Sequence, residues 1–149
     1  MQQIISRSEQ ETNTIGQAIA QQLKKGDVVC LTGNLGTGKT MLSKAIAKGL
    51  GIRELVTSPT YTIVQEYEGD IPFFHFDVYR IDDINEMFEI GFEEYLLRDG
   101  VCLIEWADRI SDILPEDCIW IHMYYGQKTE ERVIKMNKPL FISKNQEVL

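Results

Sequence analysis

The chain has few of the residues that build metal centres or disulfide frameworks. Its three cysteines, Cys30, Cys102 and Cys118, are widely spaced, each lies inside an apolar run, and no Cys-x-x-Cys pair occurs. The two histidines, His75 and His122, are far apart in the sequence. Buried strand cysteines explain this pattern better than a metal site or disulfides do. We therefore expect reduced, buried thiols and a reducing compartment.

Long apolar segments are also missing. No stretch approaches the roughly 20 apolar residues that a transmembrane helix requires. The first seven residues contain no long apolar segment of the signal-peptide type. The sequence thus predicts a cytoplasmic protein that does not associate with a membrane.

Positive charge is scarce. Fifteen Lys and Arg residues stand against 23 Asp and Glu residues, which gives a formal net charge of −8. Such a surface repels a phosphate backbone, and no run of basic residues offsets this locally. Any action on nucleic acid is therefore expected to go through another protein. The acidic stretch at residues 82–99 predicts either a solvated helical face or a docking surface for a basic partner.

What is present fits an ordinary globular domain. The 149 residues are 44% hydrophobic and 26% charged, which is typical of soluble proteins with one core. No internal repeat or low-complexity linker interrupts the chain. We expect a single domain over residues 1–149.

The most informative stretch is VVCLTGNLGTGKT at residues 28–40. Its last eight residues match G-x-x-x-x-G-K-[ST], the pattern of a phosphate loop. An apolar run at 28–31 precedes the loop as a buried strand would, and apolar residues at helical spacing follow it. A glycine-rich turn with a chance lysine is the alternative, which this strand and helix context disfavours. The expected nucleotide-binding residues are Gly33, Asn34, Leu35, Gly36, Thr37, Gly38, Lys39, Thr40 and Met41.

The chemistry of phosphate binding explains these residue types. Glycines let the backbone curl so that successive N–H groups point at phosphate oxygens. The following helix adds its unpaired N-terminal N–H groups and the positive end of its dipole. Lys39 reaches the β- and γ-phosphates, and the Thr40 hydroxyl is placed to ligate Mg²⁺. The sequence predicts a nucleoside triphosphate bound with Mg²⁺.

Two carboxylates lie where strands are expected to end. Glu105 closes the apolar run at 101–104, as the Walker B acid of a strand beside the phosphate-loop strand does. We expect Glu105 to hold the metal or activate water, with a simple salt bridge as the alternative. Asp77 is unusual for a strand position, so we expect it to face the phosphate loop and Mg²⁺, with pairing to Arg80 as the alternative.

Two further features have open interpretations. The loop at 56–61 contains Pro59 between hydroxyl residues, and its Thr60 belongs either to a switch segment that senses the γ-phosphate or to an ordinary connection. Trp106 directly follows Glu105. Its ring either stacks on a base or a partner, or caps the core.

The remaining pattern predicts an α/β fold. We expect a three-layer sandwich of the P-loop NTPase type, whose central mixed sheet has parallel core strands and antiparallel additions. Helices are predicted from a cap at Thr12 or Asn13 to Leu23, after the loop to residue 49, and at 84–90 with an extension at 93–98. Strands are predicted at 3–6, 28–31, 62–67, 71–79, 101–105, 119–125 and 132–136, with at most a short edge element at 138–149.

Four segments in order resemble the TsaE family of bacterial ATPases. They are GNLGTGKT at 33–40, SPTY at 58–61, HFDVYR at 75–80 and IEW at 104–106, and the resemblance spans residues 8–110. The last forty residues match only weakly. The family often has Asp, Phe and Pro where this chain has Asn34, Tyr61 and Ala107, but no metal ligand is changed.

The resemblance implies a function and a set of partners. It implies slow hydrolysis of ATP with Mg²⁺ in a complex with TsaB and TsaD, where TsaD transfers the threonylcarbamoyl group to tRNA and the chain meets tRNA only indirectly. It assigns catalysis to Lys39, Asp77 and Glu105, and metal binding to Thr40, Asp77 and Glu105. Thr60, Trp106, Thr12 and Arg132 are implied at the nucleotide site.

Two other functions compete with this one. A small-molecule kinase needs a mobile lid with arginines, but only Arg109 occurs between residues 105 and 125. A GTPase-like switch needs the guanine-reading N-K-x-D element, but Asn137-Lys138 leads into Pro139-Leu140 instead. We expect neither.

Overall fold

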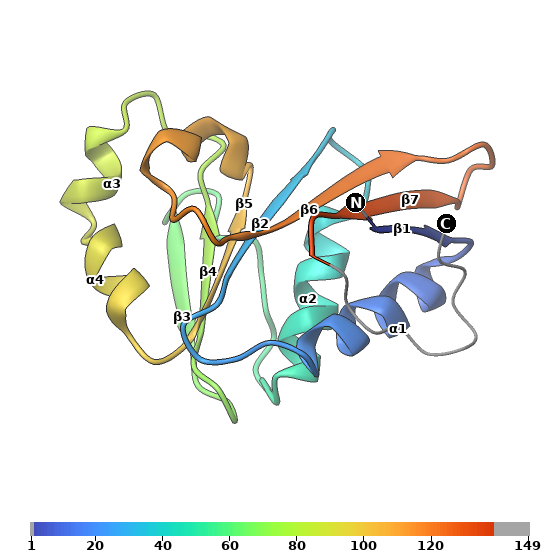
Figure 1. The fold of residues 1–149 in the computed structure, drawn as a ribbon, viewed down its shortest axis with the longest axis horizontal. Coiled ribbons are helices and arrows are strands. Elements are labelled where there is room, and N and C mark those ends of the chain that lie inside the picture. The colour runs from blue at the N-terminus through green and yellow to red at the C-terminus, as the bar shows by residue number, and fades with distance from the viewer. Residues whose placement is uncertain (1, 139–149) are drawn as a thin grey trace.

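The computed structural model describes residues 2–138 of the chain. They form a seven-stranded sheet with helices on both faces (Figure 1). The strands are β1 (Gln2–Ser6), β2 (Val28–Gly33), β3 (Val64–Tyr67), β4 (Phe73–Asp77), β5 (Val101–Glu105), β6 (Ile119–Tyr125) and β7 (Arg132–Met136). The helices are α1 (Glu9–Ala20), α2 (Lys39–Gly49), α3 (Asn85–Glu89), α4 (Phe92–Leu97) and the 3-10 helix η1 (Ala107–Ile113).

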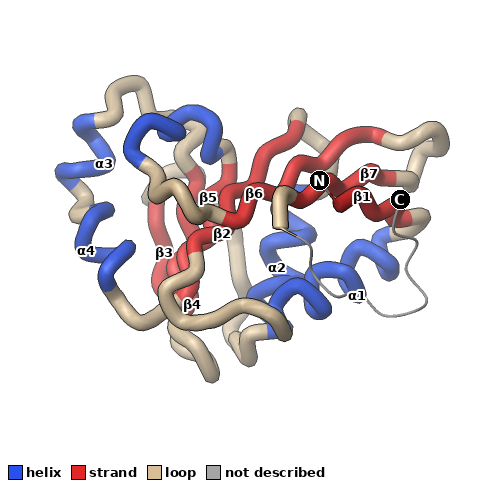
Figure 2. Tube along the Cα trace, in the orientation of Figure 1, coloured by secondary structure: helices blue, strands red, loops and turns tan. Residues whose placement is uncertain are grey.

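The sheet is mixed, as the sequence predicts. Its strand order is β1-β7-β6-β2-β5-β4-β3. The inner strands β6, β2, β5 and β4 are parallel. Antiparallel pairing adds β3 at one edge and β7 and β1 at the other. Figure 2 shows α1 and α2 grouped below the β6–β7–β1 part of the sheet, with α3 and α4 beyond its β3–β4 part.

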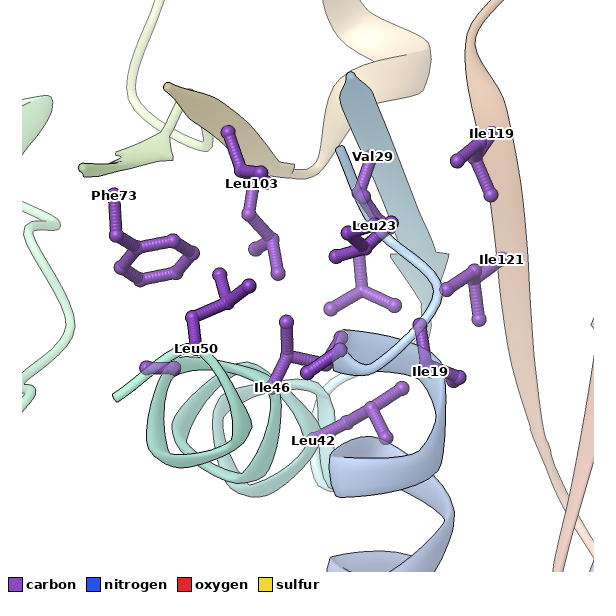
Figure 3. Packing of buried hydrophobic residues seen from close by; sticks show 14 of the residues in the cluster. Ile19, Leu23, Val29, Leu42, Ile46, Leu50, Phe73, Leu103, Ile119 and Ile121 are labelled. Carbon is purple, nitrogen blue, oxygen red and sulfur yellow. The ribbon is translucent and has the colours of Figure 1, made fainter. Parts of the chain in front are cut away.

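One face of the sheet packs against α1 and α2. Val29 of β2 and Leu103 of β5 point to this side, because alternate residues of a strand share a face. Figure 3 shows them converging with Ile19 of α1 and with Leu42 and Ile46 of α2. This is the larger of the two apolar clusters, and it fixes α2 beneath the strand that precedes the phosphate loop.

The opposite face carries a second core. The alternate β2 residues Val28 and Cys30 belong to it, together with Phe76 of β4. Met87 of α3 and Phe92 of α4 close it, and the Phe76 and Phe92 rings meet edge to face at 5.3 Å. Helices therefore cover both faces, which confirms the expected three layers.

Helix α1 begins earlier than predicted, with Ser8 rather than Thr12 or Asn13 as its N-cap. The Ser8 hydroxyl accepts a hydrogen bond from the Glu11 backbone N–H at 3.1 Å. Ser8 and Glu11 have the S-x-x-E spacing of a helix start, which explains the earlier boundary. The helix also ends before Leu23, which reaches the same core from the following turn.

Other predicted boundaries shift for local reasons. The stretch at 84–98 forms two helices rather than one extended helix, because Gly91 between them has a φ of 78°. Strand β3 starts at Val64 because the φ of Ile63 is 70°. Strand β4 starts only after Pro72. Apart from Lys138, the edge element expected at 138–149 lies outside the described residues.

The cysteines are buried with free thiols, as predicted. Burial raises the pKa of the Cys102 thiol to about 12.

Between residues 2 and 138, no helix has both the length and the apolar character that crossing a bilayer requires.

The close approach of α1 to α2 gives a test of the fold. A Cβ at Gly16 would lie 2.4 Å from the Ala45 Cβ. We expect Gly16→Leu to lower the free energy of unfolding by about 1–3 kcal/mol, because the helices must separate. Urea denaturation measures this. Thr14→Leu on the exposed side of the same helix should change it by less than about 0.5 kcal/mol, and equal losses would contradict the close-packing explanation.

Candidate nucleotide-binding site

The phosphate loop joins β2 to α2 in the predicted position. Gly36 and Gly38 have φ values of 81° and 101°, a conformation that residues with side chains rarely adopt. Gly38 is the N-cap of α2, and no side chain caps this helix end. The first N–H groups of α2 therefore remain for an anion, with the positive end of the helix dipole behind them.

Lys39 is the cation of this site. Its ammonium group donates hydrogen bonds to the backbone carbonyls of Gly33 and Asn34, the latter at 3.1 Å. It also lies 3.9 Å from the centre of the Trp106 ring. Burial lowers the pKa of Lys39, and the neighbouring carboxylates, Glu105 first, oppose this shift. The Lys39 side chain thus lies against the phosphate loop, where it is predicted to bind the β- and γ-phosphates.

Glu105 lies at the end of β5, which is parallel to β2 and places Glu105 opposite Leu31. The residue is only 2% exposed. One carboxylate oxygen accepts a hydrogen bond from the Thr40 hydroxyl at 3.3 Å, and the other lies 2.6 Å from His75 Nε2. The expected Walker B geometry is therefore present, with an acid next to the hydroxyl predicted to bind Mg²⁺.

Asp77 ends β4 directly opposite Glu105 in the parallel register. Its carboxylate accepts hydrogen bonds from the hydroxyls of Ser58 at 3.1 Å and Thr60 at 3.3 Å, and from the Tyr79 backbone N–H at 2.9 Å. Asp77 therefore ties the Thr60 loop to the phosphate-loop side of the sheet. A response of this loop to a γ-phosphate stays a prediction.

Arg80 does not pair with Asp77, which was the alternative for that carboxylate. Its guanidinium lies 4.5 Å from the centre of the exposed Tyr61 ring. Arg80 nevertheless lines the site, which the sequence did not indicate. A cavity of 440 Å³ brings together the predicted residues Leu35, Gly36, Gly38, Lys39, Thr40, Thr60, Asp77, Glu105 and Trp106, with Ser58, Tyr79 and Arg80.

Trp106 packs between two side chains of the site. Its ring contacts Lys39 on one side and lies 4.8 Å from the Tyr79 ring, centre to centre. Its half-buried indole also packs on the second core, so it caps the core as one interpretation expected. Its φ of 63° places the backbone in the left-handed region immediately after Glu105.

A second hollow of 330 Å³ lies on the other side of the loop. Its lining includes Thr12, Thr37, Met41 and Arg132. The Thr12 hydroxyl is 2.6 Å from the Ser6 hydroxyl and is buried. Thr12, Met41 and Arg132 are thus close to the loop but separate from the carboxylates. Their contact with a nucleotide stays a prediction.

Strands β6 and β7 hold the loop through its carbonyl groups. Arg132 Nε donates to the Thr37 carbonyl at 2.9 Å, and Nη2 donates to that of Gly36 at 3.4 Å. The Tyr125 hydroxyl donates to the Leu35 carbonyl. Because the N–H of a trans peptide unit points opposite to its carbonyl, the Gly36 and Gly38 N–H groups face away from these donors, whereas the Thr37 N–H donates to the Asn34 carbonyl at 3.2 Å.

Sequence reasoning missed His75, Ser58 and Tyr125 as parts of this site. His75 had a usable signal, because it lies two residues before Asp77 in a predicted strand and so shares its face. Ser58 is in the same hydroxyl-rich loop as Thr60. Tyr125 had none, since its position depends on how β6 pairs with β2.

Comparison with known proteins agrees with this geometry. Residues 6–134 match the family described as threonylcarbamoyl adenosine biosynthesis protein TsaE. This chain belongs to the TsaE family. The match continues through β6 into β7, so the expectation that the resemblance fades after residue 110 was wrong.

Individual TsaE proteins are similar over most of the chain. The tRNA threonylcarbamoyladenosine biosynthesis protein TsaE of Treponema pallidum is 42% identical over 119 residues, covering 80% of this chain and 88% of that protein. The protein of the same name from Bacillus subtilis is 46% identical over 113 residues, covering 75% and 70%. The crystal structure of Bacillus subtilis YdiB superposes with a TM-score of 0.79 at 37% identity, covering 91% of this chain and 84% of that one.

The support of the loop by Arg132 can be tested in this TsaE-family chain. We expect Arg132→Met to expose the amides of residues 34–38 more often, because the Gly36 and Thr37 carbonyls lose a charged donor. The loss of about 1.5 kcal/mol corresponds to roughly tenfold faster hydrogen exchange, which mass spectrometry measures. Arg98→Met, which removes the half-exposed pair with Glu66, should leave exchange in the loop unchanged. A response to both variants would refute a specific role for Arg132.

Proposed function

We propose that this TsaE-family chain binds ATP with Mg²⁺, hydrolyses it slowly, and serves as the accessory ATPase of the assembly that forms threonylcarbamoyladenosine in tRNA. The observation that carries the proposal is the single cavity shared by Lys39, Thr40, Asp77 and Glu105 at a phosphate loop. The names of the relatives supply the pathway, since proteins called tRNA threonylcarbamoyladenosine biosynthesis protein TsaE cover most of the chain.

The donor atoms of the site fit Mg²⁺. Thr40 and Glu105 offer oxygens 3.3 Å apart, and Asp77 adds a carboxylate in the neighbouring register position. Mg²⁺ prefers oxygen ligands and takes few of them from the protein. When bound, it would neutralise charge on the phosphate oxygens.

The residues of the chain have separable roles in the proposed reaction. The loop N–H groups and the Lys39 ammonium bind phosphate oxygens, which favours the charge that develops there during transfer. Glu105 orients the attacking water through a carboxylate oxygen. Asp77 couples the site to the Ser58 and Thr60 hydroxyls, so the loop that carries them can respond to the γ-phosphate.

The geometry gives the kinase alternative no support. Arg109 lies in η1, where its Nη1 donates to the Ile81 carbonyl at 3.3 Å and its guanidinium lies 5.3 Å from the centre of the Tyr79 ring. Only a loop follows η1 before β6. Neither feature resembles a lid that brings arginines onto a transferring phosphoryl group.

Two substitutions separate binding from hydrolysis. We expect Lys39→Ala to abolish ATP binding, because it removes the cation of the loop. We expect Glu105→Ala to retain binding and lose hydrolysis. Titration calorimetry and phosphate release measure the two quantities, and Lys44→Ala on the exposed side of α2 is the control. Hydrolysis by Glu105→Ala at the unsubstituted rate would show that its catalytic assignment is wrong.

Dependence on partners gives an independent test. We propose TsaB and TsaD as these partners, with tRNA held by them, because the net charge of −8 opposes direct tRNA binding. We expect slow turnover by the chain alone and a large rise with the TsaB–TsaD pair, since groups supplied in trans can contribute about 10³–10⁵ in rate.

The assay compares the chain alone, with each partner, with both partners, and with a panel of phosphoryl acceptors. Lys39→Ala protein measures contaminating activity. A rise only with an acceptor, yielding a phosphorylated product, would replace the proposed function with a kinase. Substantial turnover by the isolated chain would refute the dependence on partners.

A further inference from the structure

His75 lies in the middle of β4 and is completely buried. Its ring stacks on Phe73 at 5.8 Å, and its Nε2 atom is 2.6 Å from the Glu105 carboxylate. Strand β4 is otherwise rich in phenylalanine. An imidazole among aromatic residues, directed at a buried acid, requires an explanation beyond core packing.

The other ring nitrogen shows which atom carries the proton. Nδ1 of His75 is the sole buried side-chain nitrogen or oxygen, within residues 2–138, that has no hydrogen-bond partner. A proton on Nδ1 would leave a buried donor unsatisfied, which is unfavourable. A proton on Nε2 instead donates to the Glu105 carboxylate. The geometry therefore favours the tautomer with its proton on Nε2.

This hydrogen bond fixes how Glu105 presents its oxygens. The terminal torsion of a glutamate is broad and nearly two-fold, so the carboxylate is not oriented by its own rotamer. His75 holds Oε2, while Oε1 faces the Thr40 hydroxyl at 3.3 Å. One oxygen is thereby engaged inside the protein, and the other is directed at the site.

We propose that His75 is a positioning residue, which holds the Glu105 carboxylate so that one oxygen faces Thr40 and the phosphate-loop cavity. This rests on the proposed ATPase function. The unpaired Nδ1 supports it, because an apolar residue of similar size would fill the space without leaving a buried acceptor unsatisfied. The imidazole is also in direct contact with the proposed catalytic acid.

Two variants separate positioning from packing. His75→Leu keeps apolar volume and removes the donor, whereas His75→Gln keeps an N–H donor at a reach similar to Nε2. We expect His75→Leu to lower kcat roughly 10–100-fold, as removal of an outer partner of a metal-site carboxylate does. His75→Gln should recover most of the loss. Equal activity of His75→Leu and the unsubstituted chain, or no recovery with His75→Gln, would overturn the proposal.

Binding gives a readout that does not depend on turnover. We expect Mg²⁺ to strengthen ATP binding less in His75→Leu than in the unsubstituted chain, by calorimetry with and without the metal. In a Glu105→Gln background the same His75→Leu change should have no further effect, because His75 acts through that carboxylate. A full additional effect there would show that His75 acts elsewhere.

The tautomer is measured without any nucleotide. The chain has two histidines, so a ¹⁵N spectrum of the ring nitrogens, with His122→Gln for assignment, reports His75 directly. We expect a protonated Nε2 and an unprotonated Nδ1, and the reverse tautomer would overturn the proposal.

The outcomes distinguish the His75 role from the proposed function. Failure of the unsubstituted chain to bind or hydrolyse ATP would overturn both. Normal hydrolysis that His75→Leu leaves intact would overturn the His75 role alone.

Discussion

The parallel register of β4 with β5 brings two carboxylates together at the carboxyl ends of these inner strands, and the site depends on supplying both with hydrogen-bond donors. Asp77 and Glu105 are 4% and 2% exposed, and buried charge is costly unless it is paired and hydrogen-bonded. Hydroxyls from three residues, an imidazole and a backbone N–H supply those bonds. The surroundings of the acids are therefore part of the site and not merely its support.

The need of these two buried carboxylates for hydrogen-bond donors also explains how the elements are arranged around the sheet. The hydroxyls that donate to Asp77 come from the loop before β3. Strand β3 is itself held against β4 by antiparallel pairing. The hydroxyl for Glu105 comes from the first turn of α2, which the larger core holds beneath β2. On the other side of β2, the inner strand β6 brings Tyr125 and the antiparallel strand β7 brings Arg132 to the loop carbonyls. The antiparallel strand β7 and the loop before the antiparallel strand β3 thus both contribute residues to the site.

Local patterns predicted the parts of this site that lie within one segment. The loop, the helix after it and the acid at the end of β5 were all evident from the sequence, because each depends on neighbours in the chain. The start of α1 was also visible in Ser8 and Glu11, but the later Thr12 and Asn13 were preferred.

The contacts of His75, Tyr125 and Arg132 were not foreseen, because they depend on which strands pair and in which register. Pairing of Arg80 with Asp77 was the less favoured alternative, and the guanidinium instead lies 4.5 Å from the centre of the exposed Tyr61 ring.

The backbone of Trp106 has a consequence for how firmly that residue is held. A φ of 63° costs a residue with a side chain roughly 1–2 kcal/mol, and the contacts of the indole with Lys39 and Tyr79 oppose this cost. The net free energy that retains the ring is therefore smaller than its contacts suggest. The strand that ends in the proposed catalytic acid thus continues into a strained peptide unit, which the Trp106 N–H ties to the Leu31 carbonyl of β2 at 3.0 Å.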